Sequence, residues 1–333
     1  MDAKLEKKVD LLAQNYILVR NAAKLDWGQS VCLGALMFTQ RDRLAEESRI
    51  RSCRKLLKSK VSYVSNFRGL TSLALLCKMS MQNNPDAYLN DLMEAYKALT
   101  ADKILRSESL VYAAEAMAEG VDKDRYEEVA KGAWDALAKM KFAHPFLTSQ
   151  DDTAIATLLV MSGLDIDTVL ANADEIYNRM KDSGFKFNKN ALQSISLILA
   201  LSDKPVEEKC QKFTELRKAL KDARHGLGGN EVVLLAAFVN SDMPIETIVE
   251  EISAVDDALK GKKGFGNILG CGYEMRRLFA AALVLQAHEE NEVGTVTSQV
   301  NALTTIIVQQ VITLIILLVV ISSSSAAASS GAH

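Results

Sequence analysis

Apolar residues recur every three or four positions along most of the chain, the pattern of helices with one buried face. Two such stripes lie 39 residues apart, at Cys210, Phe213, Leu216 and Leu220 and at Val249, Ile252, Val255 and Leu259. Shorter segments between these stripes, such as residues 232–239 and 278–285, are apolar on almost every side. This alternation predicts an all-α protein in which short buried helices alternate with longer amphipathic ones.

The ends of the amphipathic helices recur at intervals near 40 residues. The marks are dipeptides that end at Leu99, Leu137, Met180, Leu220 and Leu259, at steps of 38, 43, 40 and 39. Units of this size are typical of helical hairpins that stack on their neighbours. We predict helical-hairpin repeats of about 40 residues, stacked as an α-solenoid-like array over residues 67–290, behind an N-terminal helical cap over residues 1–66. Asp203 and Asp242, each two residues before a proline, are predicted N-caps.

The end of the chain differs from this body. A run of nineteen uncharged residues begins at Leu303 and ends at Ile321, and fourteen of them are Leu, Ile or Val. A helix of this length spans a bilayer core of about 30 Å, although Gln309 and Gln310 would need partners there. We predict a linker over residues 291–302, a transmembrane helix over residues 303–321 and a low-complexity tail over residues 322–333. The alternative is a final helix packed on the last repeat.

Composition fits a helical protein with a cytoplasmic body. Gly and Pro together make up 21 of 333 residues, which disfavours sandwiches, barrels and propellers. The five cysteines are odd in number and widely spaced within apolar patterns, so we expect core thiols rather than disulfides. The N-terminus has no apolar run behind a basic start, so no cleavable signal is expected. The predicted topology is a cytoplasmic body with a single-pass C-terminal anchor.

The net charge of −3 is unevenly distributed. Residues 1–60 carry 13 Lys and Arg against 7 Asp and Glu, whereas the rest of the chain carries 26 against 35. Residues 41–60 predict an amphipathic helix whose basic face consists of Arg49, Arg51, Arg54, Lys55 and Lys58. This face suits anionic lipid or an acidic partner, and the alternative is a solvated cap helix. Because residues 61–333 are net negative, we do not expect nucleic acid as a partner.

Candidate chemistry is concentrated in one segment. The four histidines have no Cys or His at metal-ligand spacing, and no hydrolase, metalloprotease or nucleotide motif occurs, so no metal or cofactor is expected. The candidate binding residues are His144, Thr148, Ser149, Asp151 and Asp152, directly before an apolar helix. Two carboxylates near an imidazole could bind a divalent cation or act as acid and base. Alternatively, Ser149 caps the helix and both aspartates favour its dipole.

Three segments carry a family resemblance: the run from NYIL at residues 15–18 to Trp27, the sequence HPFLTSQDD with residues 154–159 after it, and the Ser, Ala, Gly and His ending. Together they resemble an uncharacterised bacterial family catalogued as a domain of unknown function, number four thousand and three in that series. The similarity covers most of residues 5–290. It implies a bacterial origin and an all-helical body, and it implies no activity.

Two hypotheses for function follow. The favoured one is a non-enzymatic helical-repeat interaction scaffold of unknown pathway, which binds an unidentified protein partner and is tethered to the cytoplasmic face of a bacterial membrane by its C-terminal helix. The alternative is an enzyme or divalent-metal-dependent module that uses the cluster at residues 144–152. We assign no catalytic residue.

Overall fold

The structure, a computed structural model, describes residues 1–101, 107–145, 147–182, 188–266 and 271–293. Within these residues the chain forms fourteen α-helices and four short 3-10 helices, and it contains no strand. The predicted all-α class is therefore confirmed.

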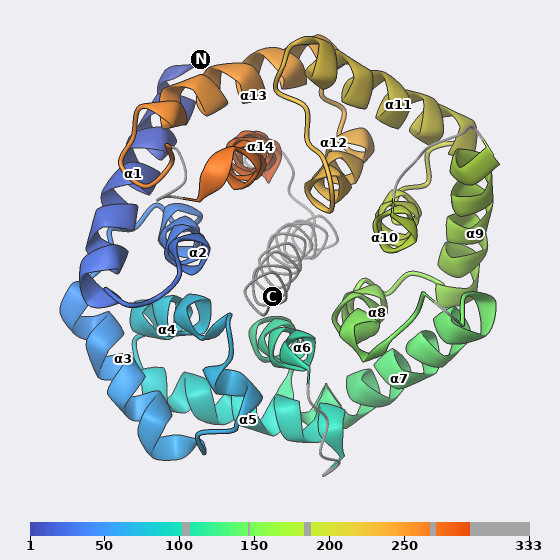
Figure 1. Ribbon diagram of the computed structural model, residues 1–333. Helices are drawn as coiled ribbons and strands as arrows, with labels where there is room; N and C mark the ends of the chain where they lie inside the picture. Colours follow the sequence, from blue (N-terminus) through green and yellow to red (C-terminus); the bar gives the residue numbers. More distant parts are fainter. Residues whose placement is uncertain (102–106, 146, 183–187, 267–270, 294–333) are drawn as a thin grey trace, which may run out of the picture.

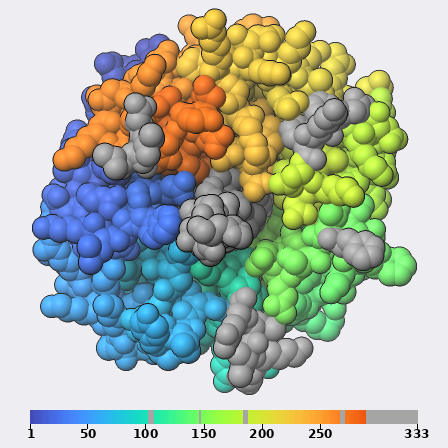
Figure 2. Space-filling view, in the orientation of Figure 1, coloured from blue at the N-terminus to red at the C-terminus, as the bar shows by residue number. Residues whose placement is uncertain are grey.

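The α-helices alternate between two layers of one closed ring (Figure 1). The outer layer consists of α1 (Ala3–Ala22), α3 (Glu47–Lys60), α5 (Pro85–Thr100), α7 (Tyr126–Ala143), α9 (Ile166–Asp182), α11 (Val206–Asp222) and α13 (Ile245–Lys260). The inner layer consists of α2 (Gly28–Thr39), α4 (Ser72–Met81), α6 (Glu108–Gly120), α8 (Thr153–Met161), α10 (Lys189–Leu199), α12 (Leu235–Asn240) and α14 (Gly272–Val293). Each outer helix forms a hairpin with the inner helix that follows it, and the seven hairpins follow one another round the molecule (Figure 2).

The two layers reflect the two kinds of apolar pattern. Inner helices are buried on nearly every side, as in α2, where all ten residues from Ser30 to Thr39 are buried. The outer helices bury one stripe each, as α11 does with Phe213, Leu216 and Leu220. A helix that neighbouring helices enclose needs apolar residues around its whole circumference, whereas an outer helix needs them on one face only.

The array closes on itself instead of remaining open. Helix α1 packs against both α13 and α14. The Tyr16 ring lies 5.6 Å from the Phe265 ring, and Lys4 Nζ donates a hydrogen bond to the Ala287 carbonyl oxygen at 2.7 Å. Residues 1–66, expected to form a cap, thus supply the first hairpin and the outer helix of the second. Ring closure covers the two end faces that an open stack of hairpins would expose.

Two predicted helix starts differ in detail. Pro205 and Pro244 themselves occupy the N-cap positions of α11 and α13, with extended backbone, and neither Asp203 nor Asp242 caps the helix. The preceding serines form the turn before each proline: Ser202 Oγ accepts a hydrogen bond from the Lys204 amide, and Ser241 Oγ accepts one from the Met243 amide. Proline favours this conformation because its ring fixes φ near −65°.

Hydrogen bonds place the described parts of the outer-to-inner connections on one rim of the ring. They join Ser30 to Leu70, Leu70 to Glu108, Ser107 to Asp151, Gln193 to Thr148, Asn188 to Asn230, Arg277 to Gly226, and Cys32 to Gly264. These links run from hairpin to hairpin and back to the first, so the connections lie side by side.

The two ends of each outer helix carry opposite charges. Each outer helix has a basic residue in its last turn, next to an outer-to-inner connection: Arg20, Lys60, Lys97, Lys141, Lys181, Lys221 and Lys260. Each has an acidic residue in its first turn: Glu6, Glu47, Asp86, Glu127, Asp167, Glu207 and Glu246. These signs complement the helix dipole, and ion pairs join the end of one outer helix to the start of the next, as Lys60 does with Asp86 and Arg179 with Glu207. We call the rim of the outer-to-inner connections the basic rim and the opposite rim the acidic rim.

No helix among the described residues has the length and apolar character needed to cross a bilayer. Helix α14 continues to Val293, so the first three residues of the predicted linker 291–302 are helical. The predicted transmembrane helix over residues 303–321 and the tail over residues 322–333 lie outside the described residues.

Candidate functional site

The segment at residues 144–152 connects α7 to α8 on the basic rim, and part of it forms a helix cap. Ser149 Oγ accepts a hydrogen bond from the Asp151 amide at 3.1 Å, and Asp152 Oδ2 accepts one from the Ser149 amide at 2.7 Å. This reciprocal capping box starts a 3-10 turn, Gln150–Asp152, that leads into α8. Burial raises the pKa of the Asp152 carboxyl. Ser149 and Asp152 are thus engaged with the backbone of their own turn.

Asp151 and Thr148 form hydrogen bonds with the two hairpins that flank this one in the ring. Ser107 Oγ donates to Asp151 Oδ1 at 2.6 Å, which links this segment to the start of α6. On the other side, Gln193 Nε2 of α10 donates to Thr148 Oγ1 at 2.9 Å. The five candidate residues therefore do not converge on one point. Among the residues that the structure describes, no group of three His, Cys, Asp or Glu side chains is arranged to hold a metal ion.

His144 ends α7 and lines a cavity of about 470 Å³ between α7, α9 and α10. Its Nε2 lies 2.7 Å from Asp174 Oδ1, and its ring centre lies 4.8 Å from that of Tyr177. Both partners belong to α9, some 30 residues further along the chain. Asp174, Tyr177 and Gln193 are not among the residues predicted from the sequence, since they lie between 30 and 49 residues after His144 and no local pattern connects them to it.

The basic face of α3 divides into engaged arginines and free lysines. Arg49 donates to the Gln82 carbonyl oxygen at 2.6 Å, Arg51 to Asn21 at 2.9 Å, and Arg54 pairs with Asp26 at 3.0 Å. The arginines thus hold α3 against the two adjacent hairpins. Lys55 and Lys58 are exposed and contact no polar partner among the described residues.

The most exposed large apolar side chains also lie on the basic rim. Among the described residues, four such side chains are more than four-fifths exposed: Leu25 (97%), Phe142 (92%), Tyr63 (83%) and Val64 (83%). Leu25 lies between α1 and α2, Tyr63 and Val64 follow α3, and Phe142 is in the last turn of α7. Trp27, also exposed, stands at the N-cap of α2. The same rim therefore presents apolar tips and lysines together.

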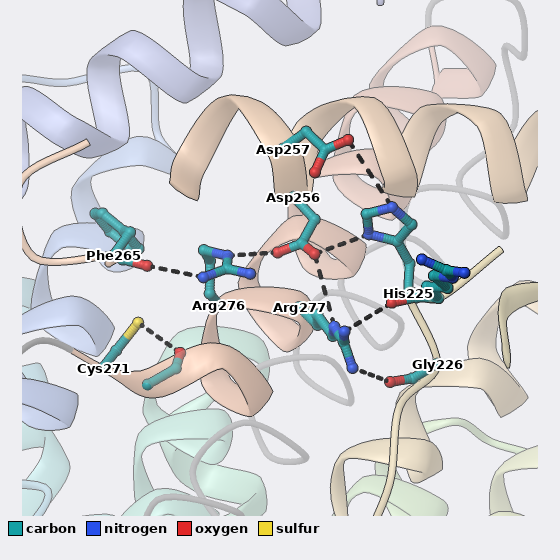
Figure 3. A network of polar contacts seen from close by, with 10 residues as sticks. His225, Gly226, Asp256, Asp257, Phe265, Cys271, Arg276 and Arg277 are labelled. Carbon is teal, nitrogen blue, oxygen red and sulfur yellow. Dashed lines mark hydrogen bonds and ion pairs between the residues drawn. The ribbon is translucent and has the colours of Figure 1, made fainter. Parts of the chain in front are cut away.

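A buried charge network joins the last two connections of this rim (Figure 3). Asp256 of α13 accepts a hydrogen bond from Arg276 Nε at 2.6 Å and lies 2.8 Å from His225 Nδ1. Arg277 Nε is 3.6 Å from the second Asp256 oxygen, and its guanidinium donates to the Gly226 carbonyl oxygen at 3.0 Å. Because Asp256 is almost fully buried, its charge is balanced by these partners and not by water. The network holds the rim in shape near the ring closure.

Residues 15–312 match the family model described as "Protein of unknown function (DUF4003)", and the chain belongs to this family. No curated protein and no solved structure matches the chain. The family assigns no activity to any residue of the rim or the cavity.

Proposed function

We propose that this member of the family is a non-enzymatic interaction scaffold whose basic rim docks on the anionic cytoplasmic surface of a membrane. The observation that carries the proposal is the coincidence of two features on one rim. The four most exposed apolar side chains described lie in or beside the outer-to-inner connections, and each of the seven outer helices has a Lys or Arg in its last turn next to such a connection. Surfaces that bind membranes peripherally combine inserted apolar side chains with cations that meet acidic headgroups.

The helix dipole alone explains part of this pattern. It favours basic residues at helix C-termini in any protein. It gives no reason for Leu25, Tyr63 and Val64 to stand exposed in the connections of the same rim, where burying each would be favourable by roughly 2 kcal/mol. Lys55 and Lys58, near these tips, have no acidic partner among the described residues, so their charge is available to a surface.

The scaffold hypothesis has two finer components. We infer that the seven hairpins are repeats of one unit, supported by the steps near 40 residues between equivalent helix ends. We also retain the tether over residues 303–321 as a proposal, since nineteen uncharged residues suit a bilayer. Docking through the basic rim does not require this tether, because α14 runs away from that rim and ends at the acidic one.

Sedimentation of the full chain with lipid vesicles tests the docking surface. We expect stronger binding to vesicles that contain phosphatidylglycerol than to vesicles of phosphatidylcholine alone, and weaker binding at high salt. A tether alone would bind both kinds of vesicle alike. Each lysine near an anionic surface contributes about 1 kcal/mol. The double variant Lys55→Gln with Lys58→Gln should therefore bind roughly 30-fold more weakly.

Matched changes at the acidic rim serve as controls. Trp27→Ser should weaken binding, whereas Leu44→Ser should not, since Trp27 and Leu44 are equally exposed (54% and 53%) on opposite rims. Lys7→Gln, in the first half of α1, controls for the lysine variant. Equal losses from both rims, or equal binding to both kinds of vesicle, would contradict docking through the basic rim.

Alkaline carbonate extraction of bacterial membranes tests the tether separately. A transmembrane helix over residues 303–321 would keep the full chain in the pellet, whereas a protein held only by its rim would be released. Release of the full chain would exclude the tether and leave the docking proposal in place.

A further inference from the structure

We infer that the cavity between α7, α9 and α10 binds an amphipathic amine, a small molecule with an apolar body and one ammonium group. This inference goes beyond the proposed function, and it does not depend on membrane docking. It rests on the size of the cavity, the side chains that line it, and the balance of charge at its edge.

The cavity has the size and lining of a small-molecule site. Its volume of about 470 Å³ lies within the range of ligand pockets. The apolar part of the lining comes from Met140 of α7, Leu170 and Ala173 of α9, and Leu197 of α10. Alanines at 138, 143 and 173 leave the space open, because larger side chains there would fill it. An apolar ligand body fits these walls.

Two pairs of charged side chains connect α7 and α9 at the cavity. Lys139 pairs with Asp167, and His144 pairs with Asp174. The first pair is electrically neutral. In the second pair, the Asp174 charge is balanced only when the imidazole is protonated, and His144 occupies only the Oδ1 oxygen. The second oxygen of Asp174 has no partner among the described residues.

Further groups around Asp174 favour a cation that donates hydrogen bonds. Gln193 Nε2 is used by Thr148, while its Oε1 has no partner among the residues described. Gln193 and Tyr177 are both more than nine-tenths buried, and both line the cavity. Helix α7 ends here, which adds a partial negative charge, and an aromatic ring attracts cations. An ammonium group can donate to the Asp174 carboxylate or to the Gln193 amide oxygen, whereas a carboxylate ligand would meet like charge at Asp174.

Isothermal titration of the full chain without vesicles tests this inference with three probes of equal chain length. Octylammonium should bind saturably with one site per chain, octan-1-ol should bind at least about tenfold more weakly, and octanoate should not bind. A hydrogen bond to a charged group has this order of effect on a binding constant. Equal binding of octan-1-ol or octanoate, or no saturable binding of octylammonium, would overturn the inference.

Two variants locate the site on the molecule. Asp174→Asn removes the charge and keeps an oxygen that accepts from His144, so the fold should persist while octylammonium binds at least about tenfold more weakly. Ala143→Leu, at an exposed lining position, should block the cavity. Ala171→Leu, the same change on the exposed side of α9 outside the cavity, should leave binding unchanged. Wild-type affinity in Ala143→Leu would show that octylammonium binds elsewhere, and the inference would fail although rim docking could still hold.

Discussion

Two buried charge networks, one near each rim, have opposite compositions. Near the basic rim, Asp256 is surrounded by Arg276, Arg277 and His225. Near the acidic rim, Lys78 of α4 lies 2.8 Å from Glu115 and 3.2 Å from Glu119 of α6. Each network thus has one central charge whose nearest partners carry the opposite sign, and a further charge lies at its edge: Asp257 beside His225, and Arg41 beside Glu119.

The two networks differ in how their partner residues respond when the central charge is removed: the glutamates around Lys78 can take up a proton, whereas the arginines around Asp256 cannot lose theirs. Burial raises the pKa of Glu115, and the nearby Lys78 ammonium opposes that shift. Burial alone would lower the pKa of Lys78, yet Glu115 and Glu119 outweigh it and raise that pKa. A glutamate that loses its partner can take up a proton, whereas an arginine keeps its charge at any pH a protein tolerates. We therefore expect the two networks to respond differently to pH when their central residue is removed.

The largest effect is expected from Asp256→Asn. The change leaves Arg276 buried without a countercharge, and breaking a buried pair in this way costs about 3–5 kcal/mol of unfolding free energy. Urea denaturation followed by circular dichroism measures this loss, which should persist from pH 5 to pH 8 because arginine stays charged. Asp257→Asn, at the exposed neighbour 3.9 Å from His225, is the control and should change stability little. A small effect of Asp256→Asn would show that the network is not needed to close the ring.

Lys78→Met should cost a similar amount at pH 8 and clearly less near pH 5. Without the ammonium, the folded-state pKa of Glu115 rises further above its unfolded value. Stability linked to a raised carboxyl pKa is fully present below the unfolded pKa and is lost as pH rises through the folded pKa. The deficit should therefore grow from about pH 4.5 upward, to about 3–5 kcal/mol.

Urea denaturation of wild type and Lys78→Met at several pH values between 5 and 8 gives that profile. Lys58→Met, at an exposed lysine of α3, provides the control and should stay within about 0.5 kcal/mol of wild type. A deficit for Lys78→Met that does not depend on pH would remove the proposed contrast between the two networks.

Gly264→Ala tests how tightly the basic rim packs at the ring closure. Gly264 has φ of +94°, and a Cβ atom there would come within 2.2 Å of the Tyr16 ring of α1. Strain and overpacking together should cost about 2–4 kcal/mol, measured as a lower thermal midpoint. Gly228→Ala, on the same rim with open space around the position, should have a much smaller effect. Equal midpoints for the two variants would mean that the closure adapts without strain.

The helical class and the two layers could be predicted from the sequence, because the spacing of apolar residues indicates how much of each helix is buried. Ring closure could not be predicted, since the apolar stripe of a helix does not specify which surface packs on it. Lys4 and Ala287, which meet at the closure, are 283 residues apart. That contact depends on the angle through which each hairpin turns relative to the one before it. A local pattern of apolar residues does not contain this angle.

The candidate site shows the same limit at the level of single side chains. The capping alternative for Ser149 could be stated from the sequence because its hydrogen bonds are local. Arg54 and Lys58 look equivalent in the sequence, yet Arg54 pairs with Asp26 of the adjacent connection and Lys58 is free among the described residues. The Asp174 partner of His144 lies on the next outer helix, so only the packing of hairpins reveals it.

The smallest effect is expected at the capping turn of the basic rim, residues 149–152. Ser149→Ala removes one cap oxygen, which should lower the free energy of unfolding by about 1 kcal/mol, while Ser149→Thr should retain most of it. Thermal melting with and without Mg²⁺ or Ca²⁺ should show no shift in either variant or in wild type, because Asp151 and Asp152 are bound to Ser107 and to the Ser149 amide. A saturable stabilisation by either cation, lost in Asp151→Asn with Asp152→Asn, would instead restore the metal hypothesis for this segment.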